Sequence, residues 1–137
     1  MSYGLAQARY ASDAAATVAP GRLLTMLYDR LVQDLSVAEA AMAALDAQAV
    51  GERIGRAQEI LLELHATLDL TVWPDGEQLA RLYLWLVSEL SQARLRADSR
   101  RVADCRALVE PLREAWHQAA AGQMALGVAA SRFGGAA

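Results

Sequence analysis

The stretch APGRLLTMLYD at residues 19–29 decides the fold, because it opens a long pattern of apolar residues at helical spacing. Pro20 suits the first turn of a helix, since its missing N–H would have no partner there and its φ is already helical. Apolar residues then recur every three or four positions. They are Leu24, Leu27, Leu31, Leu35, Ala38, Met42 and Leu45. The pattern predicts a first helix over residues 20–45.

Three further helical patterns follow. The second helix starts at the N-cap residue Asp46, and the third starts after Pro74, with Asp75 as N-cap and Gln78 as its capping-box partner. The fourth starts near Asp98 or Ser99. The apolar stripes of these helices are Val50, Ile54, Ala57, Leu61, Leu64 and Leu68; Leu79, Leu82, Leu86, Leu90 and Ala93; and Val102, Cys105, Val109, Leu112, Trp116 and Ala119.

Four amphipathic helices joined by short polar turns predict an all-α fold. Short connections make sequential helices antiparallel, so we expect an up-down-up-down four-helix bundle over residues 20–121. The flanking segments, 1–19 and 122–137, lack a sustained apolar face, and we expect both to be mobile. Pro111 removes a backbone hydrogen bond inside the fourth helix, which predicts a kink there.

The composition excludes several classes of function. The net charge is −3 and the 13 basic residues are all arginine, without the basic stripe typical of nucleic-acid binding. Arg94, Arg96, Arg100 and Arg101 gather at one helix junction, where a solvated corner is the first interpretation and a phosphate site the alternative. Residues 1–20 do not resemble a signal peptide, and no apolar run is long enough to span a membrane. We therefore expect a cytoplasmic protein.

The sequence does not predict an enzyme, a metal site or a cofactor. Glu114 and His117 form one Glu-x-x-His pair, whereas a ferritin-like centre needs two, and Leu62 stands three positions before the other histidine, His65. The single cysteine, Cys105, falls on the core stripe, where a small buried side chain is expected rather than a nucleophile. Phosphate-binding loops and nucleophile elbows are absent from the sequence.

Two helices carry apolar residues on a face that a bundle does not need to bury. Leu84, for example, lies about 160° around the third helix from Leu86 at 100° per residue. The outward residues are Gly55, Leu62, Ala66 and Leu70 on the second helix and Leu84, Val87, Ser88, Ser91 and Leu95 on the third. Scattered exposed leucines need no explanation, and that alternative stays open. Two adjacent rows nevertheless indicate a shared groove for an amphipathic segment of a partner.

Four segments carry a resemblance to a known family. In the first, Tyr10 stands ten residues before Pro20 and is followed by LLTMLYD at 23–29. The second is RAQEI at 56–60, followed by Leu64, Leu68 and Asp69, and the third is LxxLYxW at 79–85, followed by Leu90 and Ala93. The fourth is LREAW at 112–116. In order and spacing, these segments resemble the flagellin export chaperones, the FliS family, over most of residues 10–117.

The resemblance implies a cytosolic chaperone without enzymatic activity. Such a protein holds the disordered C-terminal region of flagellin in surface grooves, prevents premature polymerisation and delivers its cargo to the export gate. The matching position implies that Tyr10 anchors an N-terminal segment over part of the empty binding surface. The alternative is a generic helical adaptor for another amphipathic segment, such as an anti-sigma factor. Either protein would be a monomer or a weak homodimer.

Some residues depart from the family pattern or have structural interpretations. Arg30 stands where the family usually has a small residue, and Gly21-Arg22 replaces an acidic or polar pair. Arg94 replaces an asparagine, and Pro111 interrupts a helix that normally has no proline. We expect these differences to affect the groove contacts more than the fold. Tyr28 is expected to pack against the fourth helix with its hydroxyl at the bundle edge, and Asp29 to pair locally, for example with an arginine. Trp85 and Trp116 are expected to pack within the bundle, with a groove wall as the alternative for Trp85.

Deleting residues 1–18 tests the expected role of the N-terminal segment. We expect the affinity for flagellin to change, because the segment that covers the empty surface is removed, while far-UV circular dichroism shows nearly unchanged helicity. Loss of the fold in the truncated protein would contradict this expectation.

Overall fold

The computed structural model describes residues 18–72 and 74–134, and its regular elements there are all helical. They are α2 (Val18–Ala43), α3 (Ala47–Thr67), the single 3-10 turn η1 (Pro74–Gly76), α4 (Glu77–Arg96) and α5 (Ser99–Gly134). This content confirms the all-α prediction.

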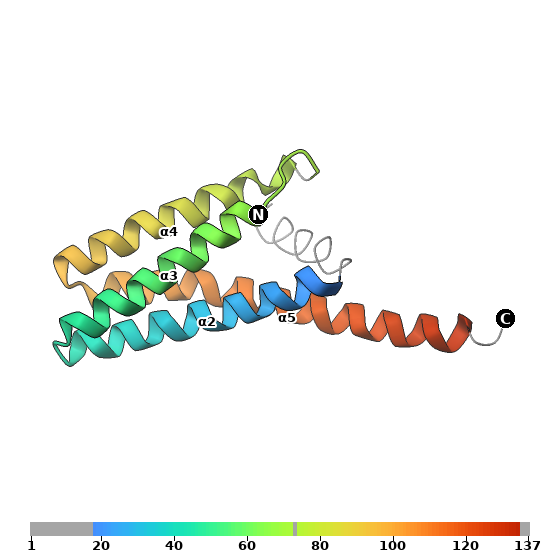
Figure 1. The fold of residues 1–137 in the computed structure, drawn as a ribbon, viewed down its shortest axis with the longest axis horizontal. Coiled ribbons are helices and arrows are strands. Elements are labelled where there is room, and N and C mark those ends of the chain that lie inside the picture. The colour runs from blue at the N-terminus through green and yellow to red at the C-terminus, as the bar shows by residue number, and fades with distance from the viewer. Residues whose placement is uncertain (1–17, 73, 135–137) are drawn as a thin grey trace.

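The four long helices form one antiparallel bundle. α2 packs against α3 and α5, α3 packs against α4, and α4 packs against α5, so that the contacts close into a ring. The chain reverses direction at each connection, which confirms the predicted up-down-up-down topology (Figure 1).

Two of the three predicted helix starts are confirmed by side-chain caps. Asp46 accepts a hydrogen bond from the N–H of Ala49 at 3.1 Å, and Asp98 accepts from the N–H groups of Arg100 and Arg101 at 3.1 and 3.3 Å. The predicted Asp75 cap of the third helix is wrong. Pro74–Gly76 form a 3-10 turn, and the N-cap of α4 is Gly76, which makes no side-chain cap hydrogen bond.

The first helix ends earlier than predicted. α2 stops at Ala43, and Leu45 adopts a left-handed φ of 58° with 90% of its surface exposed, so its place in the core stripe is a wrong prediction. The N–H of Asp46 donates to the carbonyl of Ala41 at 2.9 Å, and the N–H of Leu45 donates to Met42 at 3.1 Å. This Schellman pattern satisfies the last carbonyls of α2 and turns Leu45 away from the bundle.

The last helix extends further than predicted. α5 continues to Gly134, beyond the expected bundle boundary at residue 121, and its final turns project past the other helices (Figure 1). The alanine-rich sequence of this segment favours helix strongly enough to pass through Gly122 and Gly127. The mobility of 1–19 and 122–137 and the kink at Pro111 stay predictions.

The core follows the predicted stripes and contains a hydrogen-bonded pair of tyrosines. Tyr28 is fully buried; its ring lies 6.1 Å from that of Trp116 on α5, as centroids, and its hydroxyl is hydrogen-bonded to the hydroxyl of Tyr83 on α4. Packing of Tyr28 against α5 is confirmed, whereas the expected position of its hydroxyl at the bundle edge is wrong. The buried stripe residues include Leu24, Leu31, Leu35, Ile54, Leu61, Leu64, Leu86, Leu90, Val102, Cys105, Val109 and Leu112. Leu27, Leu68, Leu82 and Ala119 are only partly buried.

Two leucines on α3 give a matched test of this core. Leu64 is fully buried, whereas Leu62 is 48% exposed. We expect L64A to lower the free energy of unfolding by about 2–5 kcal/mol, because it leaves a cavity. L62A should change it by less than about 0.5 kcal/mol. Chemical denaturation followed by circular dichroism measures both, and equal losses would contradict the assignment of the core.

Candidate partner-binding surface

The predicted outward residues of α3 and α4 lie at the surface of the bundle. Leu62 is 48% and Leu84 47% exposed, and Leu70 and Leu95 are also exposed. The predicted place of Leu70 on the second helix is wrong, because α3 ends at Thr67 and Leu70 lies in the turn that follows. Ala66, Ser88 and Ser91 are exposed, while Gly55 and Val87 are half-buried and Val87 packs against the core. The remaining predicted contact, Tyr10, lies outside the described residues. Most of the described members of the set therefore lie at the surface, whereas Val87 packs against the core, and the binding role of all of them stays a prediction.

Gln58 joins the two rows of outward residues. Its side-chain amide on α3 donates to the carbonyl of Val87 at 2.9 Å and to the hydroxyl of Ser91 at 2.7 Å, both on α4. Gln58 lies three residues after Gly55 and four before Leu62, which puts all three on one side of α3. The rows therefore flank a common strip with Gln58 between them. Sequence reasoning did not select Gln58, although this spacing could have identified it.

Two glycines of α3 differ in what covers them. A Cβ added to Gly51 would meet the guanidinium of Arg94 on α4 at 2.8 Å, so Arg94 covers the surface there. A Cβ added to Gly55 would meet nothing within 4 Å. The surface over Gly55 is open to an approaching chain, whereas Arg94, one of the departures from the family pattern, closes the strip at Gly51.

Large apolar residues are also exposed outside the strip, among them Leu23, Met26 and Val72. Trp85 on α4 is 49% exposed and Leu108 on α5 is 43% exposed. The prediction that Trp85 packs within the bundle is wrong, whereas Trp116 is buried as predicted. Trp85 directly precedes the buried Leu86, so helical periodicity turns it away from the core.

Asp29 links α2 to α5 through two basic side chains. Its Oδ1 accepts a hydrogen bond from Nε of Arg113 at 2.6 Å and lies 2.7 Å from Nε2 of His117. Asp29 pairs with an arginine as expected, but both partners lie on α5, 84 and 88 residues along the chain, so the expectation of a local contact is wrong. Partial burial raises the pKa of Asp29, but hydrogen bonds and positive charge from His117 and Arg113 lower it by more, so the pKa lies below 3.8.

Glu114, His117 and Cys105, the side chains considered for metal binding or nucleophilic chemistry, form ordinary surface and core contacts. Glu114 accepts from Gln118 at 3.3 Å while His117 contacts Asp29, and no group of three potential metal ligands occurs among the described residues. Burial, with smaller contributions from Glu89 and Asp104, raises the pKa of the Cys105 thiol to about 12. The thiol is therefore protonated at neutral pH and packs as a small core side chain.

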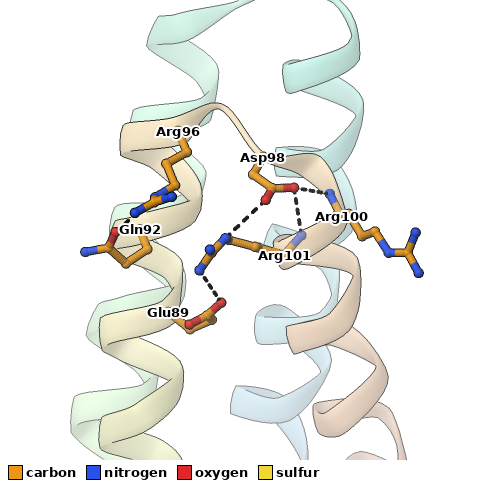
Figure 2. Close-up of polar contacts among 6 residues, drawn as sticks. All are labelled: Glu89, Gln92, Arg96, Asp98, Arg100 and Arg101. Carbon is orange, nitrogen blue, oxygen red and sulfur yellow. Dashed lines mark hydrogen bonds and ion pairs between the residues drawn. The ribbon is translucent and has the colours of Figure 1, made fainter.

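The arginines at the α4–α5 junction do not converge on one point. Arg101 donates to Asp98 at 3.1 Å and to Glu89 at 2.8 Å, which ties the start of α5 to α4 (Figure 2). Arg96 contacts Gln92 on its own helix at 3.4 Å, and Arg100 points away from Arg101 (Figure 2). This arrangement supports the interpretation as a solvated helix corner.

Comparisons with known proteins identify relatives over most of the chain. The family model described as "Flagellar protein FliS" matches residues 2–123. The flagellar secretion chaperone FliS of Bacillus subtilis (strain 168) is 28% identical over 110 residues, which cover 80% of this chain and 82% of that protein. The protein of the same name from Vibrio cholerae is 27% identical over 100 residues, which cover 72% and 74%. None of the helices in the described part of the chain is long and apolar enough to cross a membrane.

The Asp29 cluster predicts a pH-dependent contribution to stability. Since the pKa of Asp29 is lower in the folded state than in the unfolded state, its pairing stabilises the fold at neutral pH and is lost as the pH falls below about 3.8. We expect D29N to lower the free energy of unfolding at pH 7 by about 1 kcal/mol or less, because the cluster is partly exposed.

Urea denaturation across a pH series measures this contribution. The difference between D29N and the wild type should vanish in strong acid. As a control, D104N alters an exposed carboxylate of α5 that forms no ion pair with the described residues, and it should leave the stability unchanged. A D29N effect that persists unchanged in strong acid would show that the charge of Asp29 is not the cause.

Proposed function

The chain belongs to the FliS family of flagellar proteins, and on this premise we propose that it is an export chaperone for flagellin. The proposed cargo is the disordered C-terminal region of flagellin. Binding would keep the monomer from polymerising prematurely in the cytoplasm and would present it to a component of the export gate. The proposed activity is non-covalent binding by a monomer or a weak homodimer, without catalysis.

The observation that carries this proposal is the pair of apolar rows on α3 and α4. Leu62 and Leu84 each leave about half of their surface in water, on helices that Gln58 ties together. Full burial of a leucine side chain contributes about 1.5–3 kcal/mol relative to exposure. Several such side chains, covered by one amphipathic helix, supply enough free energy to offset the ordering of a disordered partner.

The small residues of the same surface support close approach of the bound segment. Gly55 has open space above it, and Ala66, Ser88 and Ser91 are exposed. Side chains of this size let the backbone of a bound helix lie near the surface of α3 and α4. We propose that the segment containing Tyr10 occupies part of this surface when cargo is absent and is displaced by it.

A charge placed in the strip tests the proposal against a matched control. Leu84 and Leu108 are 47% and 43% exposed, but only Leu84 lies in the proposed strip. We expect L84E to weaken binding of the flagellin C-terminal region at least about tenfold, a loss of 1.4 kcal/mol or more, because the glutamate would be buried without a partner. L108E should bind like the wild type.

Isothermal titration calorimetry of the folded variants with this region measures the affinities. Tight wild-type binding with a negative heat-capacity change would indicate apolar burial coupled to folding. Equal effects of L84E and L108E would contradict the proposed position of the strip. Absence of binding by the folded wild type would overturn the proposed cargo and leave a helical adaptor for another protein.

A further inference from the structure

A polar groove lies between α2 and α3, whereas the apolar strip lies between α3 and α4. It encloses about 590 Å³. Its lining consists of Leu27, Arg30, Gln33 and Asp34 from α2 and Arg53, Arg56, Glu59, Ile60 and Glu63 from α3. Three arginines and three carboxylates balance in charge, so the groove is close to neutral overall but strongly polar.

Asp34 is the buried member of this lining. Only 1% of its surface is exposed, and its Oδ1 accepts a hydrogen bond from Nη1 of Arg53 at 3.0 Å. The other carboxylate oxygen, Oδ2, is also buried and accepts no hydrogen bond from any residue that the structure describes. A buried carboxylate oxygen that remains unpaired is costly, so a hydrogen-bond donor that reaches it would relieve that cost. Asp34 lines the groove, and a rotation of its side chain would bring Oδ2 to a donor there.

The exposed charged side chains of the groove form no ion pairs within the described part of the chain. Arg30, Arg56, Glu59 and Glu63 are exposed and form no ion pair with a described residue. By contrast, the arginines that join other helix pairs are engaged: Arg101 with Glu89, Arg106 with Glu39, and Arg113 with Asp29. The α2–α3 groove thus presents both signs of charge to an incoming ligand.

These groups follow a fixed order along the groove. α2 and α3 are antiparallel, and the Asp34–Arg53 contact sets their alignment. Further along α3 come Arg56, which lies near the level of Arg30, and then Glu59 and Glu63. At 1.5 Å per residue the distance along α3 from Arg53 to Glu63 is about 15 Å, which equals about five residues of extended chain.

We propose that this groove binds a mixed-charge segment of the flagellin C-terminal region and determines the direction in which that region lies on the bundle. An amide or basic side chain of the segment donates to Oδ2 of Asp34 after the Asp34 side chain rotates to expose this buried oxygen. Acidic side chains then meet Arg30 and Arg56, and a basic side chain meets Glu59 or Glu63. This inference rests on the proposed function and deepens it, because the charge order adds register to the affinity of the apolar strip.

A double charge reversal tests the groove with an equal control. In R30E/R56E both replaced arginines are exposed, so the fold should persist. The control R96E/R100E changes the net charge equally at two exposed positions of the α4–α5 junction. We expect R30E/R56E to bind the flagellin C-terminal region at least about tenfold more weakly and with a smaller dependence on salt. The control should stay within about twofold of the wild type.

The outcomes separate this inference from the proposed function. Wild-type binding together with unchanged binding by R30E/R56E would overturn the groove proposal and leave the chaperone proposal standing. Absence of wild-type binding would overturn the chaperone proposal and the groove proposal with it. A D34N variant with wild-type helicity tests the buried acceptor, and affinity equal to the wild type would remove Asp34 from the site. Equal weakening by R96E/R100E would indicate a general effect of net charge and would also overturn the groove proposal.

Discussion

The packing of Tyr28 between α4 and α5 is the contact on which the remaining structure depends. Its ring lies against Trp116, and its hydroxyl is bonded to Tyr83 in the interior of the bundle. A buried polar pair needs its partner, so this contact restricts how far α2 and α4 can rotate about their own axes. The rotation of each helix in turn determines which residues face outward.

One consequence of this arrangement is that α3 presents two different surfaces. Toward α4 it offers Leu62 and Gly55 beside the Gln58 bridge, and toward α2 it offers charged side chains above the buried Asp34. Apolar burial is non-directional and supplies affinity, whereas ordered charges favour one register of a bound chain. A chaperone for a disordered segment benefits from both, since such a segment has no shape of its own to be recognised.

Local patterns predicted most of the fold. Periodic stripes identified the core, and Asp46 and Asp98 cap helices where expected, because capping depends on neighbours three residues away. Predictions of helix ends failed where the apolar spacing and the local backbone preferences of the chain disagreed. Apolar spacing alone placed Leu45 in the core although the chain turns there. The bundle boundary is expected at residue 121, because the apolar stripe ends near there, but α5 continues to Gly134. The exposed rows of α3 and α4 followed from periodicity, and the same periodicity could have identified Gln58 and the exposure of Trp85.

The sequence by itself determined four amphipathic helices, their antiparallel order and the apolar residues left outside the core, because these follow from period and connection length. Only the tertiary structure decided which polar groups meet. Asp29 and His117 are 88 residues apart, and Asp34 and Arg53 are 19 apart on different helices. Hydrogen bonds require atoms within about 3 Å of each other. Such distances depend on how the helices dock and rotate, which no local pattern in the chain encodes.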